Sequence, residues 1–534
     1  MAESGKILMQ DKKNSGDSID ADHVRRLTQI GLALSAEKDI DRLLEKILTE
    51  ARTITNADGG TLYLMSDNAK ELQFAIVQNE SLGLAMGGTG DEMTWPTLKL
   101  IAADGSSDHA HVSAHVAVTG EAVNIPDVYD APGFNFDGPR AFDQATGYRT
   151  QSMLVVPMRN HDNDIIGVLQ LINSKDQEEG QVIPFSGKAQ ELAGSLASQA
   201  AVALTNNLLI VELENLLDAF IQTIAIAIDE KSPYTGGHVR RVVDLTIRIA
   251  DRINHTHEGY FASISFCDDE MRELRMAAWL HDVGKITTPE HVVDKSTKLE
   301  KVYDRIEDVK IRFEMLKREY QLAIKNTWEN LNAHPSQDVE KEIKALDEEY
   351  QFLVHVNSSN EFIKDEMIER IKRIAQRKWS TSTQTLPLLT EDEIYNLSIR
   401  HGTLNAEERN IINNHAAVTY KMLAKLPFPR KLQKIAEYAA AHHEKLDGSG
   451  YPLGLKGEQL PLQSRIIALA DIFEALTAKD RPYKKEKTLS EALEIMEFMV
   501  KDQHIDSNLY ELFIKEKIYM DYAIRELTPQ QMDI

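Results

Sequence analysis

The stretch Trp279–Lys285 (Trp-Leu-His-Asp-Val-Gly-Lys) and the later stretch His442–Pro452 (His-His-Glu-Lys-Leu-Asp-Gly-Ser-Gly-Tyr-Pro) decide the interpretation of this chain. Adjacent His-Asp and His-His pairs supply imidazole and carboxylate groups. This combination binds transition metals and leaves coordination positions for water and phosphate. One short motif cannot surround two metal ions, so other segments must supply further ligands. The pattern favours metal-dependent hydrolysis of a phosphoester.

Further candidate ligands occur in three other segments. His238 follows a Gly-Gly pair at the start of an apolar, helix-periodic run, His415 ends the stretch Ile-Ile-Asn-Asn-His, and Asp471 lies in the stretch Leu-Ala-Asp-Ile-Phe. Any one of these histidines alone is more often a packed or surface residue, because imidazole is also an ordinary hydrogen-bond partner. Together they favour metal binding. The candidate metal ligands are His238, His281, Asp282, His415, His442, His443 and Asp471.

The candidate ligands occur in the order His, His-Asp, His, His-His, Asp, and Gly-Tyr-Pro stands at 450–452. This pattern resembles the HD-GYP family of HD phosphohydrolases, which degrade cyclic dinucleotides. The resemblance runs from about Asp229 to the C-terminal region, with one long interruption. It implies two divalent metal ions, with iron or manganese preferred, although the ligand chemistry alone also admits zinc, nickel or cobalt. One implied ion is held by His238, His281, Asp282 and Asp471, and the other by Asp282, His415, His442 and His443.

The resemblance also implies catalytic roles and substrate contacts. Asp282 bridges the metal ions, and Lys285, one turn beyond His281, contacts phosphate; a solvated lysine is the plainer alternative. The glycines of the second stretch permit a close backbone approach to guanine or phosphate, whereas out of this context they would simply form a turn. The expected substrate contacts are Lys285, Gly448, Gly450, Tyr451, Pro452, Arg465 and Arg481.

The chain departs from the family pattern at three places. Tyr234 stands where some members have a glutamate that supports a third metal, so two metals are expected. Glu474 replaces the usual aspartate three residues after Asp471, and the segment 478–483 is one residue longer than in many relatives. The last two differences affect substrate contacts by Glu474 and Arg481 and leave the metal ligands intact.

Length and composition limit the class of protein. The chain has 534 residues, of which 42% are hydrophobic, so it should form two or more domains. Its formal charge of −24 argues against polymeric nucleic acid as a partner. Cys267 is the only cysteine, which excludes intrachain disulfides and fits a reducing compartment. Residues 1–22 form a polar tail without a signal peptide, and no stretch is apolar enough to span a bilayer, so a cytoplasmic location is expected.

Residues 23–205 predict a sensor domain. Strands are expected at 57–64, 152–158 and 165–173. Four segments in order resemble a GAF domain, which implies an α/β fold with an antiparallel sheet flanked by helices: 58–60, 119–121, 125–127 and 146–150. The GAF ligand stays unknown, because Asn173, Lys175 and Phe185 match cyclic-nucleotide-binding members but the acidic pair is missing. The group His109, His111 and His115 is interpreted as a polar loop in preference to a metal cluster.

A helical connector is expected at 206–228, between the sensor and an all-α HD-GYP domain at 229–534. Its apolar residues recur at steps of three and four and predict a parallel homodimer, with burial against the chain's own domains as the alternative. The proposed seam is Ile210, Leu213, Leu217, Phe220, Ile224 and Ala227.

The family pattern is interrupted at about 300–398, where two apolar stripes predict an inserted coiled-coil hairpin. Its role is open between docking a partner protein, dimer contact and a solvated spacer. The first stripe begins at Leu299 and Val302, and its arm is expected to be about 45 Å long. The stripes are Leu299, Val302, Ile306, Val309, Phe313, Leu316, Tyr320 and Ala323, and then Val339, Ile343, Leu346, Tyr350 and Leu353.

The leading hypothesis is a GAF-regulated, metal-dependent phosphodiesterase that hydrolyses cyclic di-GMP to linear pGpG, with GMP as an optional further product. Two alternatives stay open: a catalytically weak signalling adaptor that binds a cyclic dinucleotide, and a hydrolase of another substrate such as cyclic GMP-AMP. The sequence leaves the GAF signal, its sign of control and the identity of the metal undecided.

Overall fold

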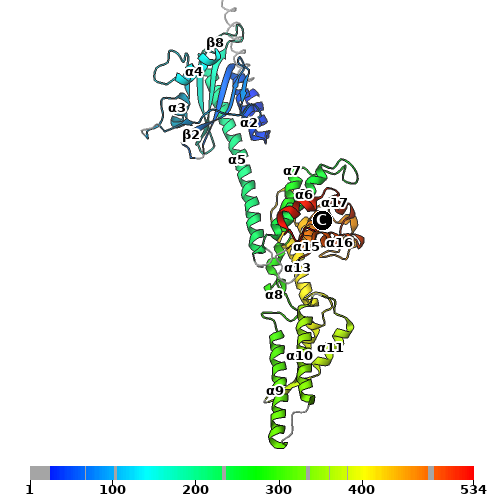
Figure 1. Ribbon diagram of the computed structural model, residues 1–534. Helices are drawn as coiled ribbons and strands as arrows, with labels where there is room; N and C mark the ends of the chain where they lie inside the picture. Colours follow the sequence, from blue (N-terminus) through cyan, green and yellow to red (C-terminus); the bar gives the residue numbers. More distant parts are fainter. Residues whose placement is uncertain are drawn as a thin grey trace, which may run out of the picture. The chain divides into compact units, whose positions relative to one another are not determined.

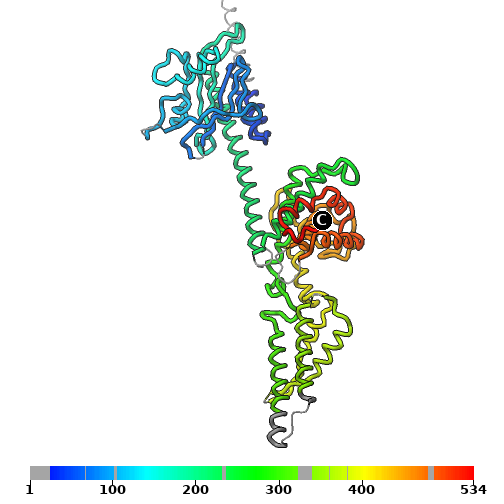
Figure 2. Tube along the Cα trace, viewed as in Figure 1, coloured from blue at the N-terminus to red at the C-terminus, as the bar shows by residue number. Residues whose placement is uncertain are grey.

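The computed structural model describes residues 25–66, 68–101, 105–230, 236–331, 337–359, 361–381, 383–478 and 486–534 (Figures 1 and 2). The chain divides into two compact units, Met1–Leu216 and Leu217–Ile534, and the division falls within the predicted connector. The tail predicted at 1–22 lies outside the described residues. Within the described ranges, every helix is too short or too polar to cross a membrane.

The first unit contains one antiparallel sheet with helices on both faces (Figure 1). The strand order is β3-β2-β1-β7-β6-β5, with β4 beside β2 and β8 beside β7. The strands are β1 (Ala57–Met65), β2 (Glu71–Asn79), β3 (Leu84–Met86), β4 (Leu98–Lys99), β5 (Val123–Ile125), β6 (Met153–Arg159), β7 (Ile165–Lys175) and β8 (Val182–Ile183). The three strands predicted from the sequence are confirmed as β1, β6 and β7.

Apolar side chains of the central strands point alternately to the two faces of the sheet, and each face has its own hydrophobic core. Leu62 and Leu169 face the helices α2 (Ile40–Thr55) and α5 (Gly187–Asp229), whereas Tyr63 on the opposite face packs towards α3 (Val112–Thr119). Successive side chains of a strand point to opposite faces, so one strand serves both cores. The helix α4 (Asp137–Thr146) lies beside the second core, whose Phe136 immediately precedes it.

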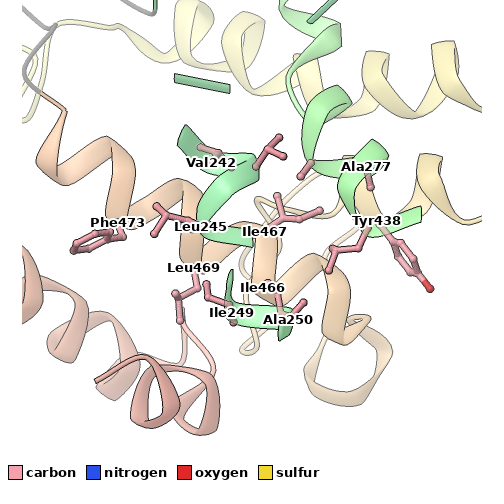
Figure 3. Close-up of a cluster of buried hydrophobic side chains, with 14 of the residues drawn as sticks. Val242, Leu245, Ile249, Ala250, Ala277, Tyr438, Ile466, Ile467, Leu469 and Phe473 are labelled. Carbon is pink, nitrogen blue, oxygen red and sulfur yellow. The ribbon is translucent and has the colours of Figure 1, made fainter. Parts of the chain in front are cut away.

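The second unit is a helical domain with one large hydrophobic core (Figure 3). Val242, Leu245 and Ile249 recur at helical spacing on α6 and pack with Ile466 and Phe473 of α15. The all-α prediction for this region is confirmed. The helices outside the insertion are α6 (His238–Asn254), α7 (Asp268–Leu280), η1 (Val283–Thr287), α8 (Glu290–Val293), α13 (Ala406–Leu423), η2 (Arg430–Leu432), α14 (Ile435–Ala440), η3 (Gly457–Gln459), α15 (Leu462–Thr477), α16 (Leu489–Lys501), α17 (Ser507–Lys515) and α18 (Ile518–Glu526).

The insertion contains more helices and strands than the two predicted arms, and it has its own core. Its elements are α9 (Ile306–Leu331), α10 (Gln337–Ser358), α11 (Asp365–Ala375), β9 (Lys378–Ser380), β10 (Thr385–Pro387) and α12 (Glu391–Leu397). Phe313 of α9, Leu346 and Leu353 of α10 and Ile371 of α11 are buried together. The two predicted arms exist, but α11, α12 and a short β-hairpin complete a small helical subdomain.

The start of the first arm was predicted wrongly. Val302 was placed in the apolar stripe, but its side chain is 94% exposed and lies before the helix. Asp304 explains the later start, because its carboxylate accepts a hydrogen bond from the backbone N–H of Ile306 at 3.0 Å. The helix α9 has 26 residues. At about 1.5 Å per residue it is about 39 Å long, shorter than predicted.

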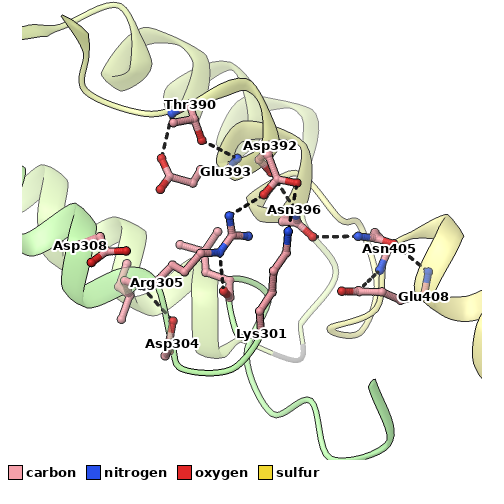
Figure 4. Close-up of polar contacts among 12 residues, drawn as sticks. Lys301, Asp304, Arg305, Asp308, Thr390, Asp392, Glu393, Asn396, Asn405 and Glu408 are labelled. Atoms are coloured by element: carbon pink, nitrogen blue, oxygen red, sulfur yellow. Dashed lines mark hydrogen bonds and ion pairs between the residues drawn. The ribbon is translucent and has the colours of Figure 1, made fainter. Parts of the chain in front are cut away.

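A polar network joins the insertion to α13 (Figure 4). Arg305 donates to Asp392 at 2.6 Å, and Asn405 donates to Asn396 at 3.1 Å. Asn405 also caps the N-terminus of α13, and Glu408 in the first turn of α13 accepts from the buried Lys295 at 2.7 Å. The base of the insertion therefore fixes the N-terminus of the helix that carries His415.

The connector is the second half of α5, a single helix of 43 residues. Leu217, Ile221 and Ala225 pack against the core of the second unit. The predicted seam is therefore wrong at Leu217, which packs within its own chain. The other predicted seam residues are exposed, namely Ile210, Leu213, Phe220, Ile224 and Ala227.

Candidate metal centre

The seven predicted ligands lie together at the centre of the second unit. His238 begins α6, His281 and Asp282 follow α7, and His415 lies in the middle of α13. His442 and His443 follow α14, and Asp471 lies on α15. Residues separated by more than 200 positions in the sequence thus meet at one buried site.

The ligand atoms form two groups that share one carboxylate. His238, His281 and Asp282 form one group and His415, His442 and His443 form the other, with the ligand atoms of each group within 4.8 Å of one another. Two distances connect Asp282 Oδ2 to the first group: 3.7 Å to His238 Nε2 and 3.3 Å to His281 Nε2. Asp282 Oδ1 lies 3.3 Å from His415 Nε2 and 4.0 Å from His442 Nε2. Asp471 Oδ1 lies 3.3 Å from His238 Nε2.

Backbone carbonyls fix the orientation of three imidazoles. The Nδ1–H groups of His281, His415 and His442 donate to the carbonyls of Ala278, Ile412 and Ala439, at 2.8, 2.6 and 2.6 Å. A carbonyl can only accept, so Nδ1 carries a hydrogen, and in the neutral form of each ring the lone pair lies on Nε2.

Four buried atoms at this point lack hydrogen-bond partners among the described residues. They are the Nε2 atoms of His281, His415 and His442 and the Oδ1 atom of Asp282. Buried polar atoms are nearly always satisfied in proteins, so four unsatisfied acceptors together need a common partner. Neutral imidazoles and a carboxylate are the donor set of divalent transition metals. The residues present therefore fit a metal centre.

Glu474 supports His238 from behind. The Nδ1 atom of His238 lies 2.5 Å from Glu474 Oε2, and Arg241 Nε donates to Glu474 Oε1 at 2.7 Å. Glu474 is fully buried, so it does not contact substrate, as its departure from the family pattern led us to expect. The sequence signal for Glu474 was its spacing from Asp471, because a residue three positions after Asp471 lies on the same face of α15 as Asp471 does.

Electrostatics favour the metal-binding protonation states of Asp282 and His443. Burial raises the pKa of Asp282, but Lys285 and His281 outweigh burial and hold that pKa well below its ordinary value. Burial lowers the pKa of His443 to about 3, against the opposing effect of Asp471. The carboxylate is thus ionised and this imidazole is neutral near neutral pH, which are the ligating forms of both groups.

Gly284 allows α13 to approach the His281-Asp282 turn. Its backbone N–H donates to Thr419 Oγ1 at 3.0 Å, and the same hydroxyl donates to the carbonyl of His281 at 3.2 Å. A Cβ atom on Gly284 would lie 2.0 Å from the carbonyl oxygen of His415. Only glycine permits this contact, which brings His415 to Asp282.

The Gly-Tyr-Pro loop folds against the second histidine group. The ring of Tyr451 lies 4.9 Å from the ring of His443, centroid to centroid. A Cβ atom on Gly450 would lie 2.4 Å from the backbone nitrogen of Lys445, so this position also requires glycine. The buried carboxylate of Glu444 accepts three backbone N–H groups, from Leu453, Gly454 and Leu455. Sequence reasoning missed Glu444, although it directly follows the His-His pair.

The remaining predicted substrate contacts have different outcomes. Lys285 reaches the centre, with Nζ 2.5 Å from Asp282 Oδ2. Arg465 does not serve as predicted: its guanidinium donates to Asp506 at 2.9 Å and to the carbonyls of Leu460 and Gly457. These bonds tie the loop after the Gly-Tyr-Pro segment to α17 and use all three nitrogens of Arg465. Arg481 and Tyr234 lie outside the described residues.

The role of Glu474 gives a direct prediction. Glu474→Gln should lower the affinity for Mn²⁺ about 10- to 100-fold, because the neutral amide orients His238 less strongly. Metal content after equilibrium dialysis at graded Mn²⁺ concentrations measures the change. Glu458→Gln, the same substitution at an exposed position, is the control. Unchanged Mn²⁺ affinity in Glu474→Gln would show that Glu474 does not support a ligand.

Three models of known protein families match the chain. The model described as GAF domain matches residues 39–204. Two models described as HD domain match residues 235–377 and 386–509. A solved GAF domain from an Acinetobacter phosphoenolpyruvate-protein phosphotransferase is 16% identical, covering 36% of this chain and 97% of that chain at a TM-score of 0.26.

Curated relatives match part of the chain. A 3'3'-cGAMP-specific phosphodiesterase 3 of Vibrio cholerae is 47% identical over 97 residues, 18% of this chain and 20% of that protein. A cyclic di-GMP phosphodiesterase of Thermotoga maritima is 38% identical over 129 residues, 24% of this chain and 34% of that protein. The chain spans about a fifth to a third of the length of the curated relatives it matches. The chain therefore combines a GAF domain with a region that matches HD domains.

Proposed function

We propose that this chain is a metal-dependent phosphodiesterase that hydrolyses cyclic di-GMP to linear pGpG, with GMP as a further product. The observation that carries the proposal is the set of unsatisfied Nε2 atoms around Asp282 in a buried site. The relatives named as cyclic-dinucleotide phosphodiesterases support this substrate class. The GAF domain supports regulation of the activity by a signal.

Two divalent ions, iron or manganese, are the proposed cofactors. His238, His281, Asp282 and Asp471 would hold one ion, and His415, His442, His443 and Asp282 the other. Bound metals in such sites activate water and stabilise the charge that develops on phosphate oxygens. Histidine-rich ligation suits this substrate, because neutral imidazoles add no negative charge that would repel a phosphodiester.

Two side chains of the protein are proposed to act on the substrate directly. Lys285 lies beside Asp282 and offers a cation to a phosphate oxygen, which matters in a chain with a formal charge of −24. Tyr451 packs beside His443 and offers an aromatic face to a base. Gly448, Gly450 and Pro452 are proposed to shape the loop that holds Tyr451.

Metal dependence is the first test of this function. Protein purified without oxygen and reconstituted with iron or manganese should cleave cyclic di-GMP, with pGpG resolved by chromatography. Treatment with EDTA should abolish the activity, because EDTA removes the metal ions from their protein ligands. Adding Mn²⁺ back should restore the activity. Full activity in protein shown to be free of metal would exclude this mechanism.

Cyclic GMP-AMP is the alternative substrate, because two curated relatives from Vibrio cholerae are named as 3'3'-cGAMP-specific phosphodiesterases. A hydrolysis panel with both cyclic dinucleotides at equal concentration distinguishes the substrates. Binding without product, in protein that contains both metals, would support a signalling adaptor instead.

A parallel homodimer through α5 is also proposed. Leu213 and Phe220 are exposed seven residues apart on one face of the helix, the spacing of a coiled-coil seam. The double variant Leu213→Glu/Phe220→Glu should convert a dimer to a monomer in light scattering, because four carboxylates would then face one another. Gln222→Glu, on the same exposed stretch, is the control. A wild-type chain that is monomeric at high concentration would contradict the proposal.

A further inference from the structure

One exposed turn of the second unit is basic, although the chain as a whole is acidic. This turn, residues 424–429, joins α13 to η2 and is called the proline turn because it contains Pro427 and Pro429. Five of the 14 residues from Lys421 to Lys434 are Lys or Arg, and none is Asp or Glu. The chain has a formal charge of −24. The proline turn therefore lies within a local excess of positive charge.

Three of these five cations are not balanced by acids. Two have acidic neighbours on α7: Lys431 pairs with Asp269, and the backbone N–H of Lys434 donates to the buried Glu273 at 2.7 Å. The other three are exposed and form no ion pair with any residue that the structure describes: Lys421, Lys425 and Arg430. More distant acids of the chain act weakly at this point, because the Debye length is about 8 Å at physiological salt.

Apolar side chains are exposed among the cations. Leu426 is 50% exposed, Tyr420 is 49% exposed, and Pro427 is exposed between them and η2. Phe428, in contrast, packs against the core of the second unit and anchors the turn. Two prolines restrict the backbone further. The proline turn thus holds apolar groups in solvent on a fixed support.

The backbone of the proline turn needs no water for its N–H groups. Those of Ala424, Lys425 and Leu426 donate to carbonyls in the last turn of α13, at 2.9, 3.3 and 3.0 Å. The N–H of Phe428 donates to the carbonyl of Leu426 at 2.8 Å, and the other two residues of the turn are prolines, which have no N–H. An N–H group without a partner is costly in an apolar medium. This turn has none, so it can enter the apolar boundary of a bilayer without that cost.

We propose that the proline turn docks on an anionic phospholipid bilayer. Leu426 and Pro427 enter the boundary between headgroups and acyl chains, and the three unpaired cations meet the lipid phosphates. Long basic side chains suit this position, because their stems contact apolar groups while their charges stay among the headgroups. An acidic protein would match the cations, but it would gain nothing from a turn whose N–H groups are already satisfied. The membrane contact is independent of the proposed metal centre and its activity.

Co-sedimentation of the full-length chain with vesicles tests this contact. The chain should bind vesicles of phosphatidylglycerol and phosphatidylcholine in equal amounts more tightly than vesicles of phosphatidylcholine alone. Added salt should weaken the binding, because it screens the attraction between the cations and the lipid. The variant Lys421→Gln/Lys425→Gln/Arg430→Gln should lower the partition coefficient about 100-fold, because each cation near an anionic surface contributes about fivefold.

A second triple variant controls for the overall charge. Lys310→Gln/Lys378→Gln/Lys515→Gln removes the same number of positive charges at exposed positions of the same unit. It should bind the mixed vesicles as the wild type does, because these lysines lie outside the proline turn. Thermal melts should show that both triple variants are folded.

A fluorophore on the proline turn identifies the surface that contacts lipid. Cys267 is the only cysteine, so the variant Cys267→Ser/Leu426→Cys carries a single environment-sensitive dye at the turn. Its emission should shift to the blue on the mixed vesicles, because the dye leaves water. The matched control is Cys267→Ser/Val302→Cys, which places the dye at a residue that is 94% exposed, and it should show no shift.

Three results would overturn the inference. The first is equal binding to the two kinds of vesicle, since anionic lipid would then not be recognised. The second is an equal loss of binding in the two triple variants, since overall charge would then control the association. The third is a dye at position 426 that does not shift on vesicles that bind the protein, since another surface would then make the contact. A shift with soluble polyglutamate in place of vesicles would assign the turn to an acidic protein.

Discussion

Asp282→Asn should reduce hydrolysis of cyclic di-GMP at least about 100- to 1,000-fold, the scale of losing one essential electrostatic group in an active site. Asp282 contacts both histidine groups, through Oδ2 towards His238 and His281 and through Oδ1 towards His415 and His442. An amide has nearly the same shape but carries no charge. It would also direct an NH₂ group towards one of the two histidine groups, and an amide nitrogen that carries two hydrogens has no lone pair for a metal ion. Both proposed metal sites should therefore be lost together.

Metal content and turnover must be measured on the same protein samples. Asp282→Asn should contain less metal as well as less activity, and a thermal melt should establish that it is folded. Asp447→Asn removes one carboxylate at an exposed position near the Gly-Tyr-Pro loop and serves as the control. Normal metal content with lost turnover would mean that Asp282 acts in the reaction but is not needed to bind metal. Normal turnover would mean that Asp282 does not belong to the active site.

The sequence indicated which residues would cluster because four of the seven candidate ligands lie in two short local patterns. His281 with Asp282, and His442 with His443, are adjacent pairs that are visible without any structure. The supporting residues carry no comparable signal. Glu474 bonds to His238 across 236 positions of sequence, and only its helical spacing from Asp471 relates it to the site.

Arg465 shows the converse error. A basic residue near the motif suggested a phosphate contact, but its guanidinium bonds to Asp506 and to two backbone carbonyls. The side chain is bonded in a fixed position within the fold. The charge of an arginine and its proximity to the motif in the sequence cannot distinguish a phosphate contact from a structural role, because both need the same planar donor group.

Periodicity predicted the apolar stripes of the insertion but not its limits. Phe313 and Leu346 are buried as expected from their spacing, whereas Val302 is exposed because the helix begins only at Ile306. An apolar stripe indicates which face of a helix is buried, but it does not indicate where the helix begins. The start of a helix depends on capping groups such as Asp304. The connector has the same ambiguity, because Leu217 and Phe220 both fit a helical repeat and only the fold assigns them to different surroundings.

Gly284→Ala should also abolish most activity, although this glycine contributes no side chain to the site. The added Cβ would lie 2.0 Å from the carbonyl oxygen of His415 and 2.8 Å from the backbone nitrogen of Thr419. Backbone atoms inside α13 cannot rotate away as a flexible side chain can, so the helix itself must shift. Overpacking of this kind typically lowers the free energy of unfolding by about 1–3 kcal/mol. A shift of about 1 Å at His415 is enough to cost about 100-fold in rate.

The comparison with Gly236→Ala separates geometry from a general effect of removing glycine. Gly236 lies two residues before His238, and a Cβ there would meet no atom within 4 Å, so this variant should retain its activity and melting temperature. For Gly284→Ala, the displacement predicts weaker binding of Mn²⁺ at the group formed by His415, His442 and His443. Metal content should therefore fall together with turnover even where the protein remains folded. A folded Gly284→Ala variant with full metal content and full turnover would mean that α13 can shift without moving His415, and that close packing at this glycine does not position the centre.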